Sequence, residues 1–188
     1  MIKYDSISKM LTVVAVLISL YLSTFEQGIT IILYPVILLL SGVVLQRFML
    51  RELSEVDSIF KEETSKQLIY YTAIAIAGIA LTGIAVKYVP SQIVGMNIVL
   101  FGVLMAVAEE VFFRGFLTNF FITRFTPAIG ILASAGIFAV YHFARYGTQI
   151  SSLIYVLAGG TILGYVAYKS GRLSPVIIAH IINNLLAA

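Results

Sequence analysis

The chain contains no cysteine and no tryptophan, only two histidines, and few charged residues, which make up 11% of its 188 positions. The absence of cysteine excludes disulfides, thiolate metal ligands and a thiol nucleophile. The net charge of +3 is too small for a nucleic-acid-binding surface, so we expect no nucleic acid among its partners. Apolar residues instead form 60% of the sequence, and the mean hydropathy is +1.01. This composition is typical of integral membrane proteins.

Seven apolar runs reach or approach the length that a helix needs to cross a bilayer, about 20 residues. They are Met10–Phe25, Ile29–Phe48, Gln67–Val86, Ile93–Leu117, Pro127–Phe143, Ser151–Tyr168 and Pro175–Ala188. These runs predict an all-α fold, a polytopic membrane bundle of about seven transmembrane helices. We expect a single integral membrane domain, residues 1–188, whose motif-bearing core covers about 93–188.

The basic residues test this count, because lysine and arginine accumulate in short loops on the cytoplasmic side. If the sides alternate, only Lys87 and Arg145 fall on the side opposite the N-terminus. Those on the N-terminal side are Lys3, Lys9, Arg47, Arg51, Lys61, Lys66, Arg124, Lys169 and Arg172. The N-terminus is therefore expected in the cytoplasm and the C-terminus outside. We expect the longest connection, Leu50–Lys66, to be a solvated connector, with an amphipathic surface helix as the alternative.

Three charges interrupt the fourth apolar run: Glu109, Glu110 and Arg114. An ionisable side chain at membrane depth costs at least ~2.5 kcal/mol, so such a residue is by default a functional candidate. Residues four apart lie on one face of a helix, whereas adjacent residues point in different directions. The spacing therefore predicts an ion pair between Glu110 and Arg114, and it leaves Glu109 as the candidate reactive group.

Both histidines also lie in apolar runs, His142 in the fifth and His180 in the seventh. Asn184 follows His180 by four residues and shares its helix face, and Phe138, an expected pocket wall, precedes His142 in the same way. Two uses of this set stay open. One is a general base, Glu109 aided by His142, that acts on water while other donors face a developing oxyanion. The other is a zinc site with Glu109, His142 and His180 as ligands.

The depth of such a site follows from the course of the fourth helix. An unbroken helix to Arg124 would put Glu109 ~22 Å from the cytoplasmic end, whereas a break at Gly115 would bring it within ~10 Å of the surface. Water must reach the site in either case, so we expect a polar cavity that opens toward the cytoplasm or laterally between helices. Two pairs of small residues, Gly130 with Ser134 and Gly160 with Gly164, predict close helix packing.

The polar residues fall into three short motifs in order along the chain: EExxxR (Glu109, Glu110, Arg114), FxxxH (Phe138, His142) and HxxxN (His180, Asn184). In this combination the chain resembles the CPBP family of intramembrane proteases. That family includes the type II CAAX prenyl proteases and the Abi or bacteriocin-processing proteins. The resemblance covers about half of the chain, from roughly Ile93 to the end.

The resemblance implies an intramembrane endopeptidase that hydrolyses a peptide bond near the membrane. It implies that Glu109 and His142 activate water, and that His180 and Asn184 stabilise the oxyanion. The family has also been catalogued as metalloproteases. We favour a metal-free glutamate mechanism and therefore expect no cofactor, with zinc as the alternative.

The resemblance also implies that Glu110 and Arg114 support the site or contact the substrate. The expected substrate is a membrane-associated peptide or protein, either prenylated or unmodified, and the expected location is a prokaryotic cell membrane. Two other functions are compatible with buried Glu and His residues. One is a non-catalytic, bacteriocin-immunity-type membrane protein, and the other is a proton-coupled transporter.

Overall fold

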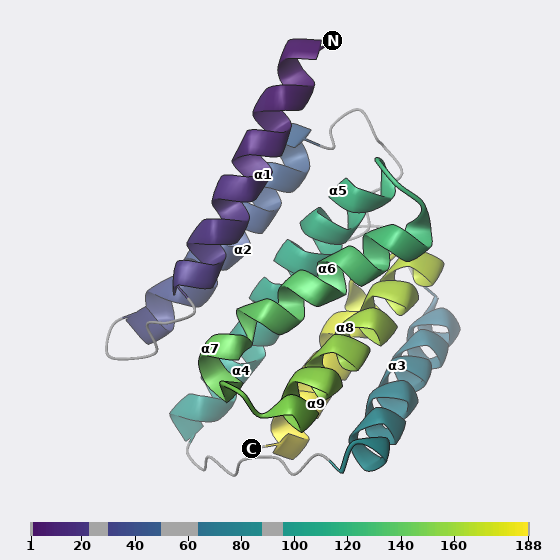
Figure 1. Cartoon of the computed structure of the whole chain (residues 1–188). Coiled ribbons are helices and arrows are strands. Elements are labelled where there is room, and N and C mark those ends of the chain that lie inside the picture. Colours follow the sequence, from purple (N-terminus) through teal and green to yellow (C-terminus); the bar gives the residue numbers. More distant parts are fainter. Residues whose placement is uncertain (1, 23–29, 50–63, 88–95, 188) are drawn as a thin grey trace.

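The computed structural model describes residues 2–22, 30–49, 64–87 and 96–187. All regular structure in this part of the chain is helical (Figure 1). The elements are α1 (Ile2–Leu22), α2 (Thr30–Met49), α3 (Ser65–Ala85), α4 (Met96–Glu109), η2 (Glu110–Thr118), α5 (Asn119–Ile122), α6 (Pro127–Tyr141), α7 (Phe143–Tyr146), α8 (Ile150–Ser170) and α9 (Ser174–Ala187). The predicted all-α class is confirmed.

Several helix ends follow from local chemistry. The Thr126 hydroxyl accepts a hydrogen bond from the Ile129 amide at 3.3 Å, and Pro127 occupies the first turn of α6, where its missing N–H costs nothing. Helix α8 ends at Gly171, which has a left-handed φ of 66° and donates its amide to the Ala167 carbonyl at 2.9 Å. Glycine adopts this conformation without strain, and the chain turns sharply there into α9.

A helix lies over the described part of each of the seven apolar runs; α4 and η2 cover the fourth, and α5 follows η2 directly. Within the described ranges, three helices are long and apolar enough to cross a membrane: Ser65–Ala85, Pro127–Tyr146 and Ile150–Ser170. Shorter apolar helices cover Lys9–Tyr21, Leu33–Arg47 and Ser174–Leu186. The count of seven spans and the orientation of the N-terminus stay predictions.

The fourth helical stretch has no break at Gly115. A break there was one of the two expectations for this stretch, and the other was an unbroken helix. Helical structure continues from Met96 to Ile122, and the helix changes its hydrogen-bonding pattern instead of stopping. Gly115 lies within the altered part, buried against Leu173 and Gln46. The depth of Glu109 in the membrane stays open.

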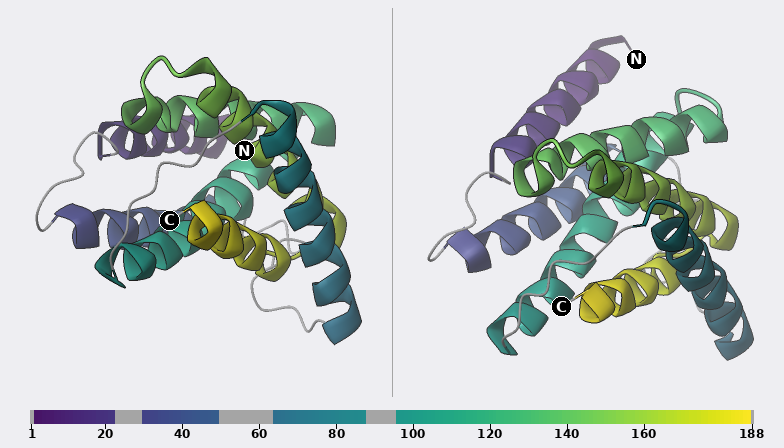
Figure 2. Two further views of the ribbon diagram at one scale, coloured as in Figure 1. Left: turned by 90° about the horizontal axis from the view of Figure 1, so that it is seen from below. Right: turned by 60° about the horizontal axis from the view of Figure 1, so that its bottom comes forward.

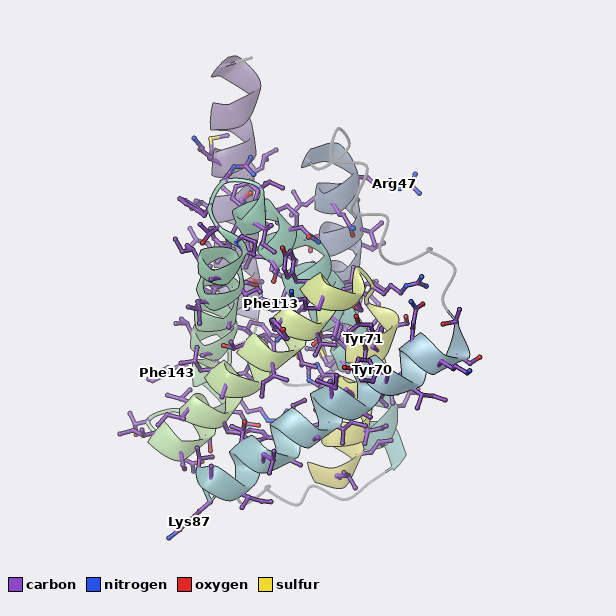
Figure 3. All side chains as sticks on the ribbon, turned by 90° about the vertical axis from the view of Figure 1, so that its right-hand side faces the viewer. Arg47, Tyr70, Tyr71, Lys87, Phe113 and Phe143 are labelled. Carbon is purple, nitrogen blue, oxygen red and sulfur yellow. The ribbon has the colours of Figure 1, made fainter. Side chains whose placement is uncertain are left out.

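Many large apolar side chains face outward, and several charged side chains lie in the interior, which is unusual for a soluble protein. On α3, Leu81 and Ile84 are 66% and 75% exposed, whereas Glu110 and Arg114 are almost completely buried. Figure 3 shows Phe113 in the interior and Tyr70 near the surface of α3. A surface of this kind suits a lipid environment and supports an integral membrane protein.

The helices surround η2, which contacts α2, α4, α5, α6 and α8. Helix α6 packs along α8, and α9 packs between α3 and α4. Helix α1 lies at the outer edge beside α2, as Figures 1 and 2 show. The site described below therefore forms where α4 passes into η2, in the middle of the bundle.

The two chain termini lie far apart, and so do two of the basic residues that were assigned to opposite sides of the membrane. The N-terminus and the C-terminus lie at opposite ends in Figure 1, and Arg47 and Lys87 lie at opposite ends in Figure 3. Their assignment to opposite sides of the membrane stays a prediction. The predicted connector Leu50–Lys66 falls mostly outside the described residues.

Both predicted small-residue pairs lie at close helix contacts. A Cβ atom added to Gly160 or Gly164 would lie 3.2 Å from Phe138 Cδ1 or 3.1 Å from Ile131 Cγ2, both on α6. A Cβ atom at Gly130 would lie 2.7 Å from the backbone nitrogen of Ile122. The absence of a side chain at these glycines lets α8 and α5 approach α6 closely.

Candidate active site

The backbone changes its hydrogen-bonding pattern at the predicted reactive residue. Helix α4 ends at Glu109, and the nine residues from Glu110 to Thr118 form a π-helix, all of them buried. A π-helix bonds each N–H to the carbonyl five residues earlier, and such segments are frequent at functional sites. Where the chain returns to α-helix, the Asn119 side-chain amide donates to the carbonyls of Arg114 and Gly115 at 3.1 and 2.8 Å. Asn119 thereby stabilises the end of the π segment.

Glu110 binds two nitrogen groups through one oxygen. Its Oε1 accepts a hydrogen bond from Arg114 Nη1 at 2.9 Å and another from His180 Nδ1 at 2.7 Å. The Arg114 contact is the ion pair that the four-residue spacing predicts. None of these side chains is exposed by more than a tenth of its surface. Glu110, Arg114 and His180 are called the charged cluster below.

Arg114 connects the charged cluster to α6 and α8. Its Nη2 donates to the Gly160 carbonyl at 3.3 Å, and its guanidinium carbon lies 4.3 Å from the centre of the Phe138 ring. A Cβ atom at Gly160 would lie 3.3 Å from Arg114 Nη2, so a side chain at this position would crowd the guanidinium. Arg114 is thus held by a carboxylate, a backbone carbonyl and an aromatic face.

His180 turns its other nitrogen toward Glu109. Nδ1 donates its hydrogen to Glu110, and in the neutral tautomer that makes this bond the lone pair lies on Nε2. That nitrogen lies 3.6 Å from Glu109 Oε2, which is too long for a direct hydrogen bond but short enough for both atoms to contact one water molecule. The two consecutive glutamates therefore contact opposite nitrogens of one imidazole.

Glu109 has neutral partners on its other side. The Tyr141 hydroxyl lies within hydrogen-bonding reach of the Glu109 carboxylate, and the Tyr34 hydroxyl donates to the Tyr141 hydroxyl. All three residues are buried. Neither tyrosine is predicted as a site residue from the sequence. The available signal was a phenol inside an apolar run, because a buried tyrosine hydroxyl usually needs a polar partner. Tyr34 and Tyr141 are called the hydroxyl chain below.

Phe138 contacts most of the site. Its ring centre lies 4.4 Å from that of His142 and 6.2 Å from that of His180, with an edge-to-face arrangement in both cases. Phe113 packs on it at 4.8 Å. Together with the Arg114 contact, these distances place Phe138 as the apolar support shared by both histidines.

His142 and Asn184 make their contacts away from Glu109. His142 caps the end of α6, and its Nδ1 donates to the Phe138 carbonyl at 2.9 Å. In the described residues, no hydrogen bond or ion pair joins His142 to Glu109. The Asn184 amide donates to the Gly102 carbonyl at 3.1 Å and so ties α9 to α4. The structure thus brings His180, and not His142, next to the predicted reactive carboxylate.

The three proposed zinc ligands do not gather into one group. Among the described residues, no three His, Cys, Asp or Glu side chains lie close enough together to hold a metal ion. His180 already uses Nδ1 for Glu110, and His142 uses Nδ1 for its own helix. The donor set of Glu109, His142 and His180 therefore does not fit a zinc site in this arrangement.

A comparison with protein families finds one match that covers this site. The family model described as type II CAAX prenyl endopeptidase, Rce1-like, matches residues 90–186, just over half of the chain. The match begins after α3 and includes α4, η2 and the elements that follow them. No curated protein and no solved structure matches the chain.

Proposed function

The chain belongs to the type II CAAX prenyl endopeptidase family, and on that premise we propose that it hydrolyses a peptide bond near the membrane with a water molecule activated by Glu109. The observation that carries this mechanism is the approach of Glu109 Oε2 to His180 Nε2, 3.6 Å apart in a buried position. A carboxylate and an imidazole that converge on one point can hold and deprotonate water there.

In this mechanism the water donates one hydrogen to Glu109 and the other to His180 Nε2. Its oxygen attacks the carbonyl carbon of the substrate as Glu109 takes the first proton. Glu109 then gives that proton to the departing amine as the carbon–nitrogen bond breaks. Glu110 fixes the orientation of the imidazole through Nδ1, and Arg114 balances the charge of Glu110.

The geometry supports different roles for the two histidines from those that the resemblance implies. His180, with its Nε2 lone pair directed at Glu109, suits the binding of water better than donation to an oxyanion. No contact among the described residues supports a role for His142 beside Glu109. Asn184 keeps its proposed role as oxyanion donor, because an amide has two N–H bonds and only one is needed for Gly102.

The proposed substrate is a membrane-associated peptide or protein. We further propose seven membrane spans with a cytoplasmic N-terminus, in the cell membrane of a prokaryote. The distribution of lysine and arginine supports this topology. Reporters fused at residues 26–28 and 50–66 should lie on opposite sides of the membrane, and reporters on the same side would refute it.

The decisive experiment compares Glu109→Gln with the unchanged protein in detergent, using a panel of farnesylated and unmodified membrane peptides. Loss of a general base typically costs ~10²-fold to 10⁴-fold in rate, so cleavage should fall by that much while the thermal transition stays the same. Glu62→Gln, in the predicted connector, is the control and should cleave normally. Asn184→Ala should retain more activity than Glu109→Gln.

Two outcomes would overturn parts of this proposal. A fully active Glu109→Gln variant would end the assignment of Glu109 as the base. Activity that a chelator removes and zinc restores would replace the metal-free mechanism with a metal-dependent one. Cleavage of the farnesylated peptides alone would define the substrate as prenylated, whereas equal cleavage of both would show that the enzyme does not need the lipid group.

A further inference from the structure

Tyr34 belongs to α2, outside residues 90–186, and yet it reaches the candidate active site. Its hydroxyl donates to that of Tyr141, which in turn lies within reach of Glu109. The two tyrosines are 107 positions apart in the chain and are both 4% exposed. Their ring centres lie 6.2 Å apart. A residue from the amino-terminal helices thus completes the surroundings of the proposed base.

The chemistry of the groups sets the direction of these hydrogen bonds. An ionised carboxylate only accepts hydrogen bonds, and a phenol has a single hydrogen to donate. Tyr141 can therefore donate to Glu109 only if its oxygen, and not its hydrogen, is used for Tyr34. When Tyr34 donates to Tyr141, the one hydrogen of Tyr141 is left for Glu109. The hydroxyl chain is ordered from α2 toward the site.

The packing of α2 holds Tyr34 at this position. Tyr34, Leu38 and Gly42 are spaced four apart, and all three are buried on one face of the helix. A Cβ atom at Gly42 would lie 3.0 Å from the Phe112 Cα atom, so the α2 backbone rests directly on η2. This contact limits sliding and rotation of α2. It fixes where Tyr34, two turns earlier, meets α6.

We propose that Tyr34 is a positioning residue for peptide hydrolysis. It acts through Tyr141, whose hydroxyl holds the Glu109 carboxylate in the orientation that faces His180. This inference rests on the proposed role of Glu109 as the base. It makes α2 part of the active site, in addition to any role in anchoring the enzyme in the membrane.

The experiment is a double-mutant cycle with Tyr34→Phe, Tyr141→Phe and both together, measured as kcat and KM on a peptide that the unchanged enzyme cleaves. Tyr141→Phe should lower kcat about tenfold to a hundredfold, as expected for loss of a hydrogen bond to a charged group. Tyr34→Phe should lower kcat about threefold to tenfold, as expected for loss of a neutral hydrogen bond. KM should stay the same in both. In the Tyr141→Phe background, Tyr34→Phe should have no further effect.

Tyr71→Phe is the matched control, because it removes a tyrosine hydroxyl that bonds the Lys169 carbonyl, at the far end of α8. It should leave kcat unchanged. The inference is overturned if Tyr34→Phe has no effect, if its effect is the same with and without the Tyr141 hydroxyl, or if it raises KM alone. These outcomes differ from failure of the proposed function, in which Glu109→Gln itself would remain active.

Discussion

The charged cluster and the hydroxyl chain lie on either side of the junction between α4 and η2. In the charged cluster, Glu110 accepts hydrogen bonds at 2.9 and 2.7 Å from Arg114 and His180, and its partners come from η2 and α9. In the hydroxyl chain, Glu109 faces Tyr141 of α6, which is supported by Tyr34 of α2. Two consecutive carboxylates thus have different environments: Glu110 bonds Arg114 and His180 directly, whereas Glu109 faces the hydroxyl chain and lies 3.6 Å from His180 Nε2.

This difference separates the work of the two glutamates. Breaking a buried ion pair by removing one partner is strongly destabilising, because it leaves an uncompensated charge. Loss of a neutral hydrogen bond costs much less. The charged cluster should therefore contribute more to the free energy of unfolding than the hydroxyl chain does, and it should fix the orientation of the imidazole. The hydroxyl chain leaves the Glu109 carboxylate available to exchange a proton. Substitutions on the two sides should show this division.

The largest effect is expected from Arg114→Met, which keeps the bulk of the side chain and removes its charge. Glu110 would then be buried without its cation, and the free energy of unfolding should fall by about 3–5 kcal/mol. Unfolding by denaturant in detergent measures this change. Lys169→Met, at an exposed position of α8, is the control and should change stability by no more than ~0.5 kcal/mol. Equal losses in the two variants would mean that the charged cluster does not stabilise the fold.

The second-largest effect is a difference between alanine variants of the two histidines in stability and in cleavage rate. His180→Ala removes the 2.7 Å hydrogen bond to Glu110, so stability should fall by about 1.5–3 kcal/mol together with the cleavage rate. His142 is only half-buried and bonds within its own helix, so His142→Ala should cost less than ~1 kcal/mol and reduce cleavage less. The measurement is unfolding and cleavage of both variants in parallel. A greater loss of cleavage in His142→Ala would restore the role that the resemblance gives to His142.

The smallest effect concerns two adjacent glycines of α8. A Cβ atom at Gly160 would crowd Phe138 and Arg114 at 3.2 and 3.3 Å, whereas one at Gly159 would meet nothing within 4 Å. Both Gly→Ala changes share the gain in helix propensity, so the difference between the two variants isolates the crowding. Gly160→Ala should be less stable than Gly159→Ala by about 1–3 kcal/mol. If both are stabilised equally, the charged cluster tolerates movement at this contact.

The sequence predicts the helices well, because apolar runs of spanning length have few alternatives to helix. Each of the seven runs coincides with a helix, including the short last one, α9. The π-helix was not predicted, since hydrophobic length does not distinguish bonding to the fourth residue from bonding to the fifth. The sequence also does not decide whether the helix breaks at Gly115. A glycine permits a break but does not require one when the neighbouring helices are packed against it.

In the candidate site, the sequence predicts contacts within one helix better than contacts between helices. The Glu110–Arg114 pair follows from a spacing of four residues alone. The neighbour of Glu109 does not, because the choice between His142 and His180 depends on how α6 and α9 pack against α4. The Tyr34–Tyr141 contact is still harder to predict, since it joins residues 107 positions apart and depends on the contact of Gly42 in α2 with η2.

The contact between Gly42 and the Phe112 backbone has a consequence for protein engineering. A graft that replaces the first two helices with unrelated apolar helices would keep the hydrophobic thickness and still lose this fit. To preserve activity, a chimera would need a glycine at the crossing point and a tyrosine eight residues before it. The amino-terminal helices can therefore be exchanged between relatives only with both of these residues retained.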